Sequence, residues 1–140
     1  MPSWDEIRDH LRNTFNVVRD EPHAMALAWT ITLDQGEFVQ KLGLAPMTVD
    51  SRPWLTMIAE IAVEDTIPIR TALVYQDRLP FGGLVLRKGL YLLRHGVPLE
   101  ETPLSELDWI IRLLADAAAH LRISLHVAPP SGEPFTGYED

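Results

Sequence analysis

The fold is decided by residues 79–121, whose sequence is LPFGGLVLRKGLYLLRHGVPLEETPLSELDWIIRLLADAAAHL. It opens with two apolar runs, 84–87 and 90–95, separated by Lys88-Gly89, and a two-residue turn containing Gly is typical of a β-hairpin. Between residues 107 and 121 the apolar side chains instead recur at spacings of three and four, which predicts a long amphipathic helix. The stretch therefore predicts a hairpin followed by a long final helix.

Three further strands are predicted upstream of this stretch. Residues 24–33 alternate between large and small side chains, which is the period of a half-buried strand. The turn-forming residues 34–37 lead into an extended run, 38–44, and Pro46 places the end of that run at a sheet edge or a bulge. Another strand is predicted at 54–63. Because the connections are short, the three strands should form an antiparallel meander.

Two more helices complete the predicted order. Ser3 and Glu6 have the spacing of a capping box, and the apolar residues that follow predict a helix over 4–16. Residues 66–77 are ambiguous, because their β-branched content favours a strand whereas the early Pro68 suits the first turn of a helix. We predict a helix there. The fold class that follows is α+β, an antiparallel sheet of about five strands with helices packed on it, in the order α-β-β-β-α-β-β-α.

Length and composition fit one small domain. The 140 residues are enough for a single core, so we expect one domain over 1–125 and a Pro-rich acidic C-terminal tail over 126–140. The net charge of −8 repels phosphate backbones and argues against nucleic acid as a partner. The N-terminal residues lack the apolar segment of a secretory signal, and no stretch has the composition of a membrane span. We therefore expect a cytoplasmic protein with no membrane partner.

No pattern of residues predicts catalysis. The sequence contains no cysteine, which excludes disulfides, Cys-based metal sites and a Cys nucleophile. None of the five histidines has another histidine three to five residues away, and no nucleophile elbow or phosphate-binding glycine loop occurs. The adjacent acids Glu64-Asp65 and Glu100-Glu101 lie at the ends of predicted elements, where carboxylates are usually solvated. We predict no catalytic residues, no metal and no cofactor, and thus no enzyme.

The tryptophans are the candidates for contacts with a partner. Trp29 lies among the large residues of the strand at 24–33 and is predicted to be in the core. Trp4 and Trp54 begin a predicted helix and a predicted strand, and Trp109 lies beside the main apolar stripe of the last helix. Tryptophan is enriched at the energetically important positions of interfaces. Peripheral core is the alternative for each residue, and we predict Trp4 and Trp54 as protein-binding residues.

The predicted order of elements resembles the fold of the type III secretion chaperones, and most of all the related YbjN-type family of bacterial sensory transduction regulators. Four features carry the resemblance over about residues 22–123: the turn at 79–82 before a short strand, the hairpin at Lys88-Gly89, the strand that ends with Arg94-His95 and then Pro98-Leu99, and the Ala-rich final helix.

The resemblance implies a small acidic homodimer that binds another protein or an extended peptide segment and has no enzymatic activity. Ile69 and Leu73 are the candidate dimer-interface residues, and the sheet edges could accept an extended segment by β-augmentation. Two alternatives stay open at this point. The chain could be a structural or regulatory subunit of a larger complex, or a small-ligand-binding protein with its site between the sheet and the last helix.

Overall fold

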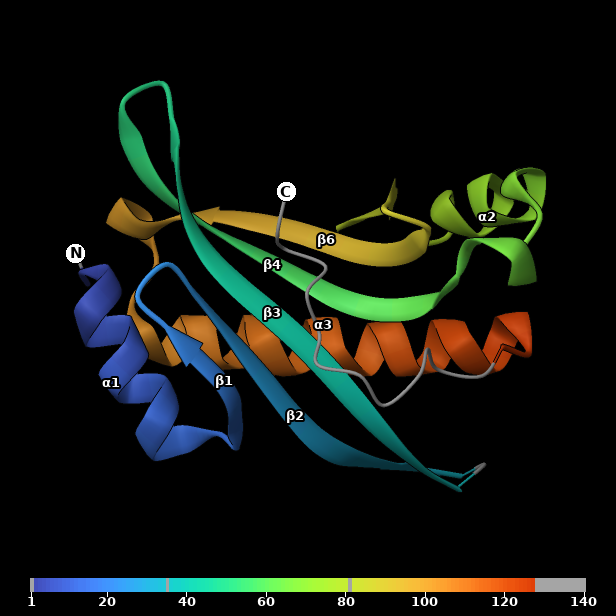
Figure 1. Cartoon of the computed structure of the whole chain (residues 1–140), viewed down its shortest axis with the longest axis horizontal. Helices are drawn as coiled ribbons and strands as arrows, with labels where there is room; N and C mark the ends of the chain where they lie inside the picture. Colours follow the sequence, from blue (N-terminus) through green and yellow to red (C-terminus); the bar gives the residue numbers. More distant parts are fainter. Residues whose placement is uncertain (1, 35, 81, 128–140) are drawn as a thin grey trace.

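The computed structural model describes residues 2–34, 36–80 and 82–127, which form one curved antiparallel sheet with helices packed against it (Figure 1). The elements are, in chain order, α1 (Trp4–Thr14), β1 (Val17–Glu21), β2 (Ala24–Leu33), β3 (Gly36–Val49), β4 (Arg52–Val63), the 3-10 helix η1 (Glu64–Thr66), α2 (Ile69–Gln76), β5 (Gly83–Arg87), β6 (Leu90–Pro98), the 3-10 helix η2 (Leu99–Glu101) and α3 (Leu104–Leu125). The order of the strands in the sheet is β1-β2-β3-β4-β6-β5. The predicted α+β class is confirmed.

The strand count was too low by one, because β1 was not predicted. Its sequence, VVRDE, is only five residues long and three of them are charged, so it shows neither an apolar run nor a clear alternation. It forms because Pro22 and His23 turn the chain and let β1 pair antiparallel with the start of β2, where Glu21 lies opposite Ala24. The sheet thus has six strands in the described residues, with β1 and β5 at its edges.

The core lies between one face of the sheet and α3, which crosses behind the strands in Figure 1. A row of fully buried side chains crosses four paired strands in register: Leu27, Leu42, Ala59 and Leu93. The helix contributes its predicted apolar stripe to the same cluster, namely Leu107, Ile110, Ile111, Leu114, Ala115, Ala118, Ala119 and Leu121. The predicted final helix is therefore confirmed, and it packs along the length of the sheet.

Pro46 lies within β3 instead of ending it. The pairing of β2 with β3 stops at the pair Met25 and Leu44, so beyond Leu44 the strand β3 pairs only with β4. Pro46 lies opposite Leu55 in this one-sided part of the ladder. A residue without an N–H is tolerated there because the strand is locally an edge.

The ambiguous segment 66–77 is helical, as predicted. The 3-10 turn Glu64–Thr66 precedes it, and α2 begins after Pro68, whose missing N–H needs no partner at a helix start. Ala72 is the buried residue of this helix. Ile69 and Leu73 point away from the core, with 64% of each residue exposed.

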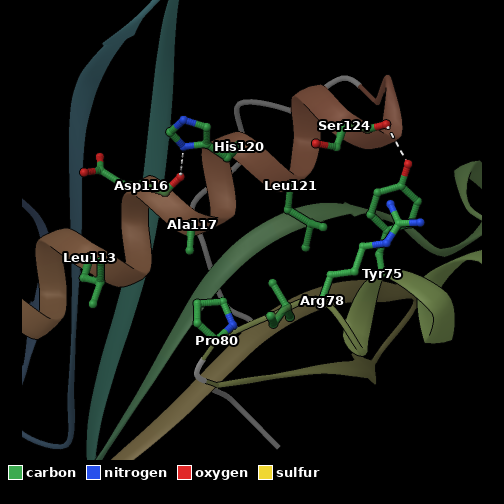
Figure 2. A pocket seen from close by; sticks show the side chains of 10 residues that line it. Tyr75, Arg78, Pro80, Leu113, Asp116, Ala117, His120, Leu121 and Ser124 are labelled. Carbon is green, nitrogen blue, oxygen red and sulfur yellow. Dashed lines mark hydrogen bonds between the residues drawn. The ribbon is translucent and has the colours of Figure 1, made fainter.

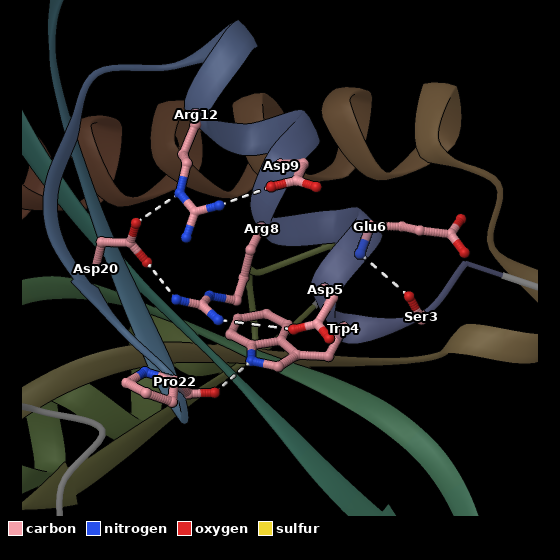
Figure 3. A network of polar contacts seen from close by, with 9 residues as sticks. All are labelled: Ser3, Trp4, Asp5, Glu6, Arg8, Asp9, Arg12, Asp20 and Pro22. Carbon is pink, nitrogen blue, oxygen red and sulfur yellow. Dashed lines mark hydrogen bonds and ion pairs between the residues drawn. The ribbon is translucent and has the colours of Figure 1, made fainter.

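A network of polar contacts fixes α1 beside β1 (Figure 3). Ser3 Oγ accepts a hydrogen bond from the Glu6 N–H at 3.1 Å, as the capping box predicts. Asp20 accepts hydrogen bonds from Arg12 Nε at 2.6 Å and from Arg8 Nη2 at 3.0 Å. Both bonds hold the pKa of the Asp20 carboxyl below its usual value, and the bond from Arg12 has the larger effect. His10 Nε2 lies 2.7 Å from an Asp108 carboxylate oxygen, which connects α1 to α3.

The expected C-terminal tail lies almost wholly outside the described residues. The last helix ends at Leu125, His126 takes a left-handed conformation with a φ of 55°, and Val127 is the last residue that the structure describes. The division into a domain over 1–125 and a tail stays a prediction. Among the described residues, no helix combines the length and the apolar content that crossing a membrane requires.

Candidate protein-binding site

An open, largely apolar groove lies between α3 and the end of α2 with the turn that follows it, and we call it the α3 groove (Figure 2). Its volume is about 440 Å³. The residues that line it come from α3 and from the end of α2 with the turn that follows: Tyr75, Arg78, Leu79, Pro80, Leu113, Asp116, Ala117, His120, Leu121 and Ser124. The α3 groove therefore joins two segments that lie more than thirty residues apart in the sequence.

Tyr75 and Arg78 set the second wall of the α3 groove. The Tyr75 hydroxyl donates a hydrogen bond to the Ser124 carbonyl oxygen at 3.3 Å, and so connects α2 to the last turn of α3. The Arg78 guanidinium lies over the Tyr75 ring, 4.9 Å from its centre. On the opposite wall the Nδ1–H of His120 donates to the Asp116 carbonyl oxygen at 2.8 Å. The rim is thus polar and already hydrogen-bonded, whereas Leu113, Ala117 and Leu121 form an apolar floor.

This geometry suits apolar side chains presented by another polypeptide. Trp109 is 62% exposed and precedes Leu113 by four residues, so it extends the apolar surface by one turn toward the start of α3. Exposed aromatic and aliphatic residues next to a groove are typical of sites that take up a peptide or a helix. A ligand between the sheet and α3, one of the alternatives from the sequence, meets an apolar core whose described side chains are already buried there.

A second apolar surface is exposed on α2. Ile69 and Leu73 are accompanied by Val74, which is 49% exposed, so three aliphatic side chains of an eight-residue helix face away from the core. Leu86 on the edge strand β5 is exposed as well, and α2 contacts β5. We call Ile69, Leu73 and Val74 the α2 face. The two residues predicted for a dimer interface thus lie together on the surface.

The two tryptophans predicted for partner contacts lie in different places. Trp4 is half-buried against the core, and its indole N–H donates to the Pro22 carbonyl oxygen at 2.8 Å. Trp54 is half-buried on β4, where it lies opposite Met47 on β3 and Pro98 on β6. Neither lines the α3 groove or the α2 face. Their role in binding a partner stays a prediction.

Buried charges lie where α3 ends over the sheet. Arg122 is 2% exposed and donates from Nη2 to the Val39 carbonyl oxygen at 3.1 Å, and burial lowers the pKa of its guanidinium against the opposing effect of Glu60. Glu60 is 4% exposed, and burial raises the pKa of its carboxyl although Lys41 and Arg122 oppose the shift. Within the described part of the chain, no three His, Asp or Glu side chains lie close enough together to hold a metal ion.

The sequence had indicated only a residue next to the α3 groove. Trp109 stood out because it lies beside the main apolar stripe of the last helix, although it does not line the groove itself. Tyr75, Arg78 and Leu79 carried no such signal, because they become a wall only when α2 packs against the far end of α3. Their proximity is a tertiary property that local spacing does not encode.

Comparisons with known proteins show the fold. The chain is similar to a chain of the HopA1–SchA chaperone–effector complex, with a TM-score of 0.56 and 19% identity over 84% of this chain and 90% of the other. It is also similar to a chain of the ExsC–ExsE complex, with a TM-score of 0.60 and 12% identity over 94% of this chain and the whole of the other. The chaperone-like fold expected from the sequence is confirmed.

No protein-family model matches the sequence, and no curated protein matches it. The resemblance to the YbjN-type family therefore stays a prediction.

Proposed function

We propose that this chain is a non-enzymatic, chaperone-like protein-binding module that holds a segment of another protein. The observation that carries the proposal is the similarity in fold, over 84% and 94% of the chain, to chains solved in a chaperone–effector complex and in the ExsC–ExsE complex. The sequence identity to these chains is too low to specify the partner. The exposed surface of this chain indicates which kind of contact the partner makes. The proposed site of action is the cytoplasm.

The α3 groove is the proposed site for the partner. It offers the apolar floor of Leu113, Ala117 and Leu121, with the exposed Trp109 beside it. Burying apolar area contributes about 25 cal/mol per Å², so a few leucine-sized anchors in such a groove give useful affinity. The α2 face is the proposed homodimer interface, because it presents three exposed aliphatic side chains on one short helix.

A capture experiment with matched variants tests the proposal. The immobilised chain is incubated with native cell extract and compared with Leu113→Asp, which places a charge in the α3 groove, and with Val18→Asp, which places one on the exposed edge strand β1. We expect one protein to be retained by the wild type and by Val18→Asp, and its retention to fall at least tenfold with Leu113→Asp.

The captured protein should also protect the backbone amides of the α3 groove from hydrogen exchange. Hydrogen exchange of the purified complex should slow at residues 113–124 of α3 relative to the free chain. Retention that Leu113→Asp leaves unchanged, or a complex in which this part of α3 exchanges as in the free chain, would exclude the α3 groove as the site. Failure to retain any protein would count against the proposed function as a whole.

A further inference from the structure

Trp109 is the exposed aromatic residue of α3. The other aromatic residues that the structure describes are buried or half-buried, whereas 62% of Trp109 is exposed. The residue precedes Leu113 of the α3 groove by one helical turn, so its ring enlarges the apolar surface of the groove. A large apolar side chain that adjoins a groove is typical of a site for a protein partner. The groups around the ring therefore indicate which side chain it receives.

Acidic side chains flank Trp109 on the same face of α3. Glu106 precedes it by three residues, and Asp116 follows Leu113 by three. The helical repeat brings these four side chains within an arc of about 80° around the axis of α3. Glu106 and Asp116 are exposed, and among the described residues neither carboxylate has an ion-pair or hydrogen-bond partner. His120, one turn beyond Asp116, donates its Nδ1–H to the Asp116 carbonyl oxygen and not to the carboxylate.

The arginines of this region are already stacked on other rings of the chain. The Arg112 guanidinium lies 4.8 Å from the centre of the Phe15 ring, at the end of α1. The Arg78 guanidinium lies 4.9 Å from the centre of the Tyr75 ring, and in Figure 2 the Asp116 carboxylate points away from it. Within the described part of the chain, no cation lies over the Trp109 ring. This face of α3 thus presents a ring without a stacked cation beside two unpaired carboxylates.

A guanidinium satisfies both features of this face at once. The face of an indole ring attracts a cation more strongly than the other aromatic rings do, and a planar guanidinium also stacks on it. The same group forms ion pairs with carboxylates beside the ring. The net charge of −8 favours the approach of a basic segment over an acidic one.

We propose that the partner binds the α3 groove through a basic segment, in which an arginine stacks on Trp109 between Glu106 and Asp116. Apolar side chains beside that arginine then contact Leu113 and the rest of the groove floor. This inference rests on the proposed function, because it names the chemistry of the segment that the α3 groove takes up.

Two synthetic peptides test the proposal without a captured partner. The first is an amidated peptide of alternating leucine and arginine, and the second has citrulline, an uncharged isostere, at each arginine position. Each is titrated into the full chain by calorimetry, and the NMR signal of the Trp109 indole N–H locates the contact. We expect the arginine peptide to shift this signal and to bind about tenfold more tightly than the citrulline peptide.

Variants of the exposed face separate the ring from the carboxylates. Trp109→Leu keeps an apolar side chain and should weaken the arginine peptide about threefold more than it weakens the citrulline peptide. Glu106→Gln and Asp116→Asn should weaken the arginine peptide alone. Glu37→Gln, which removes an exposed carboxylate on β3, is the matched control and should leave both affinities unchanged.

Two outcomes would overturn the proposal. Equal affinities for the two peptides would mean that the charge contributes nothing. Binding of the arginine peptide that Trp109→Leu and Glu106→Gln leave unchanged would mean attraction to the acidic surface in general.

The capture experiment distinguishes this inference from the proposed function. Retention that falls with Leu113→Asp but not with Trp109→Leu or Glu106→Gln would keep the α3 groove as the site and exclude an arginine stacked on Trp109. Failure to retain any protein counts against the proposed function, whereas the two peptides still decide whether Trp109 and its carboxylates recognise a guanidinium.

Discussion

Glu60 is a buried carboxyl whose pKa is raised by its surroundings in the sheet. It lies on the central strand β4 with 4% of its surface exposed, and desolvation favours its neutral form. Lys41, which is one step from the register pair Leu42 and Ala59, favours the charged form but does not outweigh the desolvation. A carboxyl whose pKa is raised in the folded state reduces stability as the pH rises above the pKa of the unfolded chain.

Replacing Glu60 with Gln should therefore stabilise the protein in a pH-dependent way. Below pH ~4 the carboxyl is protonated in both states and the Glu60→Gln variant should unfold at the same temperature as the wild type. As the pH rises through the usual carboxyl pKa to the raised value, the wild type loses stability and the variant does not. Thermal unfolding at pH 3 and pH 7 measures the difference, with the exposed Glu37→Gln as the control. Equal unfolding temperatures at pH 7 would contradict this account.

The β5–β6 hairpin depends on the conformation of two glycines. Gly82 and Gly89 have φ angles of 70° and 77°, in the left-handed region that favours glycine. They differ in their surroundings, because a Cβ at Gly82 would lie 2.9 Å from the Arg94 carbonyl oxygen, whereas a Cβ at Gly89 would meet nothing within 4 Å. The backbone at Gly82, just before β5, thus packs closely against β6, whereas the β5–β6 turn at Gly89 has free space around it.

Alanine at the two positions separates backbone strain from close packing. Gly89→Ala should cost about 1 kcal/mol through the left-handed conformation alone. Gly82→Ala should cost more, about 2–3 kcal/mol, because the clash with the β6 backbone adds to the same strain. Urea unfolding of the two variants gives the comparison. Equal losses of stability would show that β5 is free to move away from β6 at Gly82.

The elements with a strong local signal were predictable, and those that depend on neighbours were not. The strand at 24–33, the helix after residue 103 and the Lys88-Gly89 turn each combine periodicity with suitable turn residues. The charged strand β1 forms only because it can pair antiparallel with β2 through backbone hydrogen bonds. The α3 groove likewise required the packing of α2 against α3, so its second wall could not be inferred from spacing.

At the scale of the whole molecule, the α2 face is the surface that a second copy would cover. Light scattering of the purified chain should give twice the 15.8 kDa mass of one chain. Leu73→Glu should reduce it to a single chain, because the new carboxylates would be buried against an apolar surface without a partner. Val18→Glu, on the exposed edge strand β1, should leave the dimer intact. If the wild-type chain has the mass of a monomer in light scattering, the α2 face is not a homodimer interface.

Native mass spectrometry of the complex purified from cell extract tests the central claim most directly, because it counts both kinds of chain at once. We predict a complex that contains two copies of this chain together with a protein partner, from which Leu113→Asp removes the partner and Leu73→Glu separates the copies. A single species at 15.8 kDa, with no partner in the wild type or in either variant, would contradict the proposal that this chain works by binding proteins.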